Sequence, residues 1–131
     1  MAELLVPISP GELIDKITIL EIKSARMTDA AKLHNVRTEL NLLNETWRAS
    51  AYSQVDITVE WTALRDVNAQ LWDIEDDIRD KERDGEFDAK FIELARAVYV
   101  TNDERAAVKR RINTKLGSAL VEEKSYKDYK K

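Results

Sequence analysis

The sequence predicts an all-α protein, a bundle of about four helices with a short extended N-terminal segment. Two observations support this class. Apolar residues recur at steps of three and four along most of the chain, the spacing of one helix face, as in Leu33, Val36, Leu40, Leu43 and Trp47. Glycine and proline are scarce, with three and two in 131 residues, which favours helices over loops and sheets.

The clearest start signal precedes a helix expected over residues 10–26. Ser9 can accept a hydrogen bond from the backbone N–H of Glu12, and the Glu12 carboxylate can reach back to Ser9, which together form a capping box. Pro10 occupies the first helical position, where its missing N–H costs nothing. Because apolar residues surround most of this helix, we expect it at the centre of the core.

Three more helices are expected over about residues 30–49, 56–84 and 89–116. Asp29 can cap the start of the second, and Gly85 and Gly117 are typical of C-terminal caps. A capping-box pattern at residues 101–104 would allow a break in the last helix, but no Gly or Pro enforces one, so we expect it to be continuous. The last two helices, each about 42 Å long, should form a long antiparallel hairpin.

The two shorter helices cannot cover this whole hairpin. Its remaining apolar surface must be covered by the C-terminal tail, a kink or a second copy, and we therefore expect a homodimer. The chain is predicted to form a single domain over residues 1–131, with an extended segment over 1–8 and a tail over 118–131.

Composition excludes several classes of site. The absence of cysteine rules out disulfides, thiol nucleophiles and thiolate metal sites. His34 is the only histidine, which argues against histidine-based zinc sites and a Ser-His-acid triad. No apolar run approaches the ~20 residues of a membrane span, and the N-terminus does not resemble a signal peptide. We expect a soluble cytoplasmic protein with no cofactor and no membrane partner.

Charge is unevenly distributed along the chain. Residues 73–90 hold nine acidic and four basic residues, whereas nine basic and three acidic residues follow from Arg105 onward. These runs are either solvated helix faces or surfaces that dock on one another, within the chain or between copies. The net charge of −4, with no matching motif, makes nucleic-acid binding a poor hypothesis.

Polar residues interrupt the apolar rows of three helices and form the candidate site. Because buried polar groups are costly unless satisfied, a cluster of them needs a reason. Asp15 and Lys16 are further candidates on the first helix. The candidate cluster consists of Glu21, Asn68, Glu75, Asn102, Arg105 and Lys109.

Three interpretations of this cluster remain open. It is a structural network that specifies register or oligomeric state, a row that is exposed or covered by a partner protein, or a pocket for an anionic small molecule. In the pocket, Arg105 and Lys109 would bind the anion and Glu21 or Glu75 would act as acid or base. No catalytic residue or metal ligand is singled out.

Two functions follow from these interpretations. The first is a non-catalytic oligomerising or protein-interaction domain, in which Arg105 and Lys109 pair with Glu21 or Glu75 and leave no cavity. The alternative is a small helical-bundle enzyme or binder of a phosphorylated or carboxylated metabolite, with or without Mg²⁺. It requires an open pocket of at least about 300 Å³ lined by these groups.

Residues 6–23 read VPISPGELIDKITILEIK. This run resembles the signature of a family of small bacterial proteins known only as a domain of unknown function, as do residues 71–79, 101–103 and 121–126. The resemblance covers nearly the whole chain. It implies one intact domain that includes the tail through Tyr126, and it implies no activity.

Overall fold

The computed structural model describes residues 2–130 and contains α-helices but no strand in that range. The helices are α1 (Pro10–Arg26), α2 (Ala30–Ala49), α3 (Thr58–Asp84) and α4 (Ala89–Leu116), and a short 3-10 helix, η1 (Ala51–Gln54), links α2 to α3. The all-α class is confirmed, and the four helices begin and end close to the positions that the sequence predicts.

Local capping explains where these helices begin and end. The Ser9 hydroxyl oxygen accepts from the backbone N–H of Glu12 at 3.2 Å, as expected. The other half of the capping box is absent, because the Glu12 carboxylate instead pairs with lysines, including Lys109 at 2.7 Å. Gly85 and Gly117 end α3 and α4 with φ of 66° and 67°, a left-handed conformation that glycine adopts without steric cost.

The long hairpin of α3 and α4 is also confirmed. The two helices pack closely against each other, and α4 continues without a break through Thr101, which is buried. The expectation of a continuous last helix was therefore correct.

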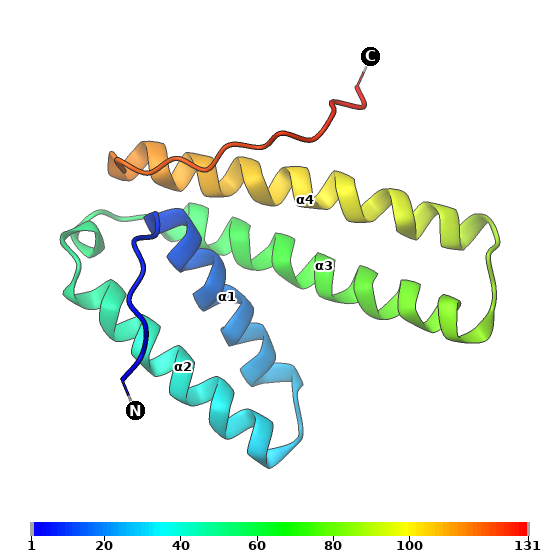
Figure 1. The fold of residues 1–131 in the computed structure, drawn as a ribbon, viewed down its shortest axis with the longest axis horizontal. Coiled ribbons are helices and arrows are strands. Elements are labelled where there is room, and N and C mark those ends of the chain that lie inside the picture. The colour runs from blue at the N-terminus through cyan, green and yellow to red at the C-terminus, as the bar shows by residue number, and fades with distance from the viewer. Residues whose placement is uncertain (1, 131) are drawn as a thin grey trace.

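Figure 1 shows two helical hairpins that meet at one end and diverge at the other. We call α1 and α2 the arm, and α3 and α4 the hairpin. At the closed end, the start of α1 lies beside the start of α3 and the end of α4. At the open end, the arm and the hairpin point away from each other. Helix α1 packs against all three other helices, so its central position is confirmed.

The hydrophobic core lies at the closed end. None of residues 69–84 in α3 is buried, although that stretch is more than half of the helix. The rings of Trp47 and Trp61 pack edge to face against each other, with centroids 5.8 Å apart. Both residues also pack against the core. The core consists of Leu13, Ile14, Ile17, Ile57, Leu64, Val108, Ile112 and Leu116.

Both ends of the described chain are extended. The tail after α4 turns back and runs along that helix (Figure 1), where Lys124 pairs with Asp103 and the rings of Tyr99 and Tyr129 lie 4.9 Å apart. Residues 2–9 precede α1 without regular structure, and Leu4 is 95% exposed. None of the helices described combines the length and apolar character needed to cross a bilayer.

Candidate functional site

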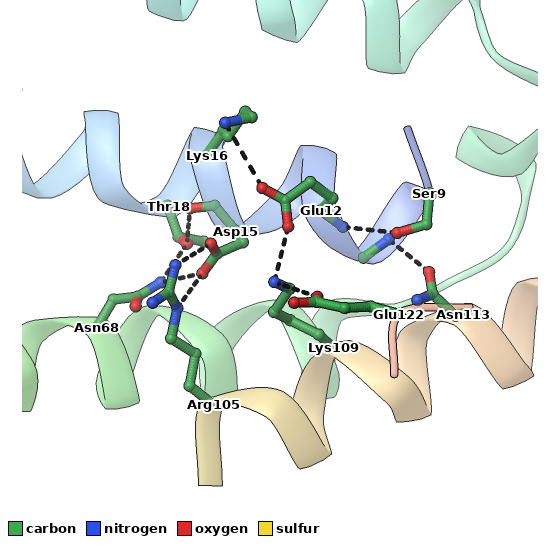
Figure 2. A network of polar contacts seen from close by, with 11 residues as sticks. Ser9, Glu12, Asp15, Lys16, Thr18, Asn68, Arg105, Lys109, Asn113 and Glu122 are labelled. Carbon is green, nitrogen blue, oxygen red and sulfur yellow. Dashed lines mark hydrogen bonds and ion pairs between the residues drawn. The ribbon is translucent and has the colours of Figure 1, made fainter. Parts of the chain in front are cut away.

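A buried carboxylate at the closed end joins three helices. Asp15 of α1 is 1% exposed and accepts hydrogen bonds from Nε of Arg105 at 2.9 Å and from its Nη2 atom. It also accepts from Nδ2 of Asn68 on α3 at 3.0 Å. Figure 2 shows these side chains converging between α1, α3 and α4. A two-pronged Arg–carboxylate contact of this kind adds geometric specificity as well as energy.

Thr18 completes this cluster one turn further along α1. Its hydroxyl accepts from Nδ2 of Asn68 at 3.0 Å and donates to the backbone carbonyl of Asp15 at 2.9 Å. The Asn68 amide therefore uses its two hydrogens on two oxygens of α1 (Figure 2). Because Asn68 and Thr18 are both buried, these contacts replace the water that either group would otherwise need.

The electrostatics favour the charged forms of this pair. Burial alone would raise the pKa of Asp15, but hydrogen bonds from Arg105 and Asn68 outweigh it and hold that pKa below its usual range. The hydrogen bond to Asp15 raises the pKa of Arg105. Asp15 is thus held as a carboxylate beside a guanidinium, which makes it a poor general acid or base at neutral pH.

A second ion cluster lies one turn along α4 and includes the tail. Lys109 is 7% exposed, and its ammonium lies 2.7 Å from carboxylate oxygens of both Glu12 on α1 and Glu122 in the tail. Burial would lower the pKa of Lys109, but these two carboxylates raise it overall. Lys109 is therefore a fixed cation that binds the first turn of α1 and the tail to α4 (Figure 2).

A close approach of α1 to α4 depends on a glycine. The backbone N–H of Gly11 donates to Oδ1 of Asn113 at 2.8 Å. A Cβ atom at position 11 would lie only 2.6 Å from the backbone carbonyl oxygen of Lys109 and 2.9 Å from Oδ1 of Asn113. Only glycine allows the two helices to approach this closely without displacement.

The structure distributes the sequence-predicted residues over three places. Asn68, Arg105 and Lys109 lie in the clusters just described. Glu21 instead accepts from Nε1 of Trp61 at 3.1 Å and pairs with Arg65 at 2.8 Å.

The remaining two predicted residues lie toward the open end. Glu75 pairs with Arg79 one turn along α3, at 3.2 Å. Asn102 is half-buried, and its side chain makes no hydrogen bond within residues 2–130. Neither Glu21 nor Glu75 pairs with Arg105 or Lys109; their carboxylate partners are Asp15, Glu12 and Glu122.

An open groove of about 420 Å³ lies in the angle between the arm and the hairpin. Its apolar wall consists of Ile19, Ile22, Leu71 and Trp72. Its polar lining combines predicted site residues with one unpredicted acid and comprises Asn68, Glu75, Asp76, Asn102 and Arg105. Arg105 therefore connects the buried cluster to the groove.

A second hollow, of about 360 Å³, lies beside the start of α3. Trp47, Trp61 and Arg65 line it together with the residues that precede and begin α3. Within residues 2–130, no group of three or more His, Cys, Asp or Glu side chains is placed to hold a metal ion. The described residues thus form interhelical ion pairs beside an open groove.

Comparison with known proteins identifies a family but no activity. No curated protein and no solved structure matches the chain significantly. A family model described as a family of unknown function (DUF6165) matches residues 4–129, which include all four helices and nearly the whole tail. The chain therefore belongs to this family of unknown function, DUF6165.

Proposed function

We propose that the protein is a non-catalytic oligomerising domain that forms a homodimer. The buried charged residues at the closed end are already engaged with partners within the chain. Asp15 is bound by Arg105 and Asn68, and Lys109 is bound by Glu12 and Glu122. A carboxylate and a cation held in this way connect helices, which is the role of a structural network.

The observation that carries the proposal is the divergence of the arm from the hairpin. At the open end the hairpin has only its own two helices, and no residue of α3 after Asn68 is buried. Apolar side chains are exposed there, with Phe87 61% and Ile92 58% exposed, and the groove leaves Trp72 half-buried. Exposed apolar surface of this kind is typical of protein contact sites.

Light scattering after size exclusion tests the proposal directly. Over about 1 to 100 µM, the chain should show a mass of twice 15.1 kDa. Trp72→Ala should weaken the dimer, whereas Leu42→Ala, on an exposed part of α2, should not. A monomeric mass at every concentration would overturn the proposal.

A second function is supported by the groove itself, whose volume of about 420 Å³ exceeds the ~300 Å³ lower limit of ligand pockets. In this alternative the groove binds a phosphorylated or carboxylated metabolite through Arg105 and Asn102, with or without Mg²⁺. Thermal unfolding with nucleotides, phosphorylated metabolites and Mg²⁺ tests it. A ligand at 100 times its Kd adds about 2.7 kcal/mol of stability, and Asn102→Ala should abolish that gain without disturbing the buried clusters.

The proposal also carries over three expectations from the sequence. They are a cytoplasmic location, a bacterial source, and the absence of membrane and nucleic-acid partners. Each stays a prediction. Fluorescence imaging of a tagged chain in a bacterial host would test the location.

A further inference from the structure

We infer that the acidic open end of the hairpin binds the basic end of the arm of a second copy. This inference rests on the proposed homodimer and names its contact surfaces. The arm end comprises residues 23–37, where the last turn of α1 leads into the start of α2. The hairpin end comprises residues 73–88, the last turns of α3 and the turn before α4.

The two surfaces carry opposite charge. Residues 23–37 contain four basic side chains and one carboxylate, from Asp29. Residues 73–88 contain nine carboxylates and three basic side chains. Surfaces of opposite sign steer association and select one orientation of the partners. This contrast is sharper than the one between the acidic run and the C-terminal basic run, because Arg105, Lys109 and Arg110 are already paired within the chain.

One contact within the chain already uses the same chemistry. Nη1 of Arg26, at the end of α1, donates to Oδ1 of Asp73 at 2.6 Å. The Arg26 guanidinium also lies over the Trp72 ring, 5.9 Å from its centroid. Helix α3 of the hairpin thus binds an arginine of the arm through a carboxylate and, beside it, an aromatic face.

Part of each surface remains unpaired within the described chain: six of the nine carboxylates of the hairpin end have an ion-pair partner there, and of the four cations of the arm end only Arg26 has one. Within residues 2–130, neither Asp76 nor Asp77 of α3 has an ion-pair partner, and the same holds for Lys32 and Arg37 of α2. All four residues are exposed. They are available for pairing between copies.

A two-fold axis would satisfy both surfaces at once. Each copy would place its arm end on the hairpin end of the other, so that the same contact occurs twice, as in an isologous interface. Because the groove lies between arm and hairpin, the exchange would also cover its apolar wall, including Ile22, Leu71 and Trp72. Charge would then orient the partners while the groove supplies apolar burial.

A charge-swap experiment tests this arrangement. The arm variant Lys32→Glu/Arg37→Glu and the hairpin variant Asp76→Lys/Asp77→Lys should each raise the dimer Kd at least about tenfold, since like charges now face each other. An equal mixture of the two should recover the wild-type dimer mass as a heterodimer. In that heterodimer the acidic arm faces the basic hairpin, and the unchanged arm faces the unchanged hairpin.

The control is Arg48→Glu/Arg111→Glu, which makes the same change in net charge as the arm variant at exposed positions of the closed end. It should leave the dimer Kd within about twofold of wild type. Recovery in the mixture with an unaffected control supports the inference. A dimeric wild type without recovery would overturn it while the homodimer stands, whereas a monomeric wild type would overturn both.

Cross-linking gives an independent answer if a variant folds poorly. The chain contains no cysteine, so single substitutions label one position each. A mixture of Lys32→Cys and Asp77→Cys chains should form a disulfide-linked dimer of twice 15.1 kDa on mild oxidation. A mixture of Arg48→Cys and Asp77→Cys should not, and equal cross-linking in both mixtures would contradict the inference.

Discussion

The closed and open ends of the molecule use the same residue types in different ways. At the closed end, Asp15 and Lys109 are buried between helices, and each is paired with a charged side chain on another element. At the open end, Glu75 pairs only with Arg79 on its own helix, and Asp76 has no ion pair in the described chain. The comparison teaches that a charged side chain supports the fold where several helices meet, and that its residue type alone does not decide this.

The largest expected effect comes from removing the carboxylate at the junction. Asp15→Ala leaves the Arg105 guanidinium partly buried without its partner, which should cost about 3–5 kcal/mol of unfolding free energy. Urea denaturation measures it. The matched variant at the open end, Glu75→Ala, removes an exposed pair within one helix and should cost at most about 0.5 kcal/mol. Similar losses in the two variants would remove the distinction between the ends.

A smaller loss of unfolding free energy is expected from adding an atom where α1 approaches α4. In Gly11→Ala the added Cβ would lie 2.6 Å from the Lys109 carbonyl oxygen, so α1 must move away from α4. Overpacking of this kind should cost about 1–3 kcal/mol, although alanine is the better helix former. Thermal unfolding measures the change, and a variant as stable as wild type would show that the two helices separate freely.

The stability contributed by Asp15 at the closed end should also depend on pH. The pKa of Asp15 is lowered from 3.8 in the folded protein, so the folded state binds this proton less readily than the unfolded state. The stabilisation is complete above the unfolded pKa and is lost as pH falls through the lower folded value. Below pH ~4, the wild type should lose more stability than Asp15→Asn, which cannot titrate there. Parallel pH profiles in urea denaturation would contradict this.

The smallest effect is expected at an exposed position of the open end. Ile92 is 58% exposed, so Ile92→Ser should change the unfolding free energy of a dilute sample by no more than about 0.5 kcal/mol. Urea denaturation at low protein concentration measures this. A loss above about 2 kcal/mol would mean that the open end is packed in the monomer as well.

The helices were predictable because their signals are local. Ser9 before α1 and Gly85 and Gly117 after α3 and α4 act within one turn of the chain. The divergence of the arm from the hairpin depends on contacts between helices, such as the approach of Gly11 to Asn113. No local pattern encodes those contacts.

The candidate site was predictable on two helices and not on the third. Asn68, Arg105 and Lys109 stand out because they interrupt clear apolar rows on α3 and α4. Helix α1 is apolar on most sides, so the sequence does not show which of its faces meets α4. Its pattern favours Glu21 and makes Asp15 only a further candidate. Glu122 lies in a tail without periodicity, and no sequence signal connects it with Lys109.

The pairing of Asp15 with Arg105 also constrains how the chain folds. These residues are 90 positions apart. The arm and the hairpin, in contrast, each join two helices that are neighbours in sequence. The chain-length part of the entropy for closing so long a loop is about 4 kcal/mol, which favours local hairpins forming before distant contacts. We therefore expect α1 to dock onto a preformed α3–α4 hairpin late in folding, so that the buried ion pair forms after the hairpin rather than nucleating it.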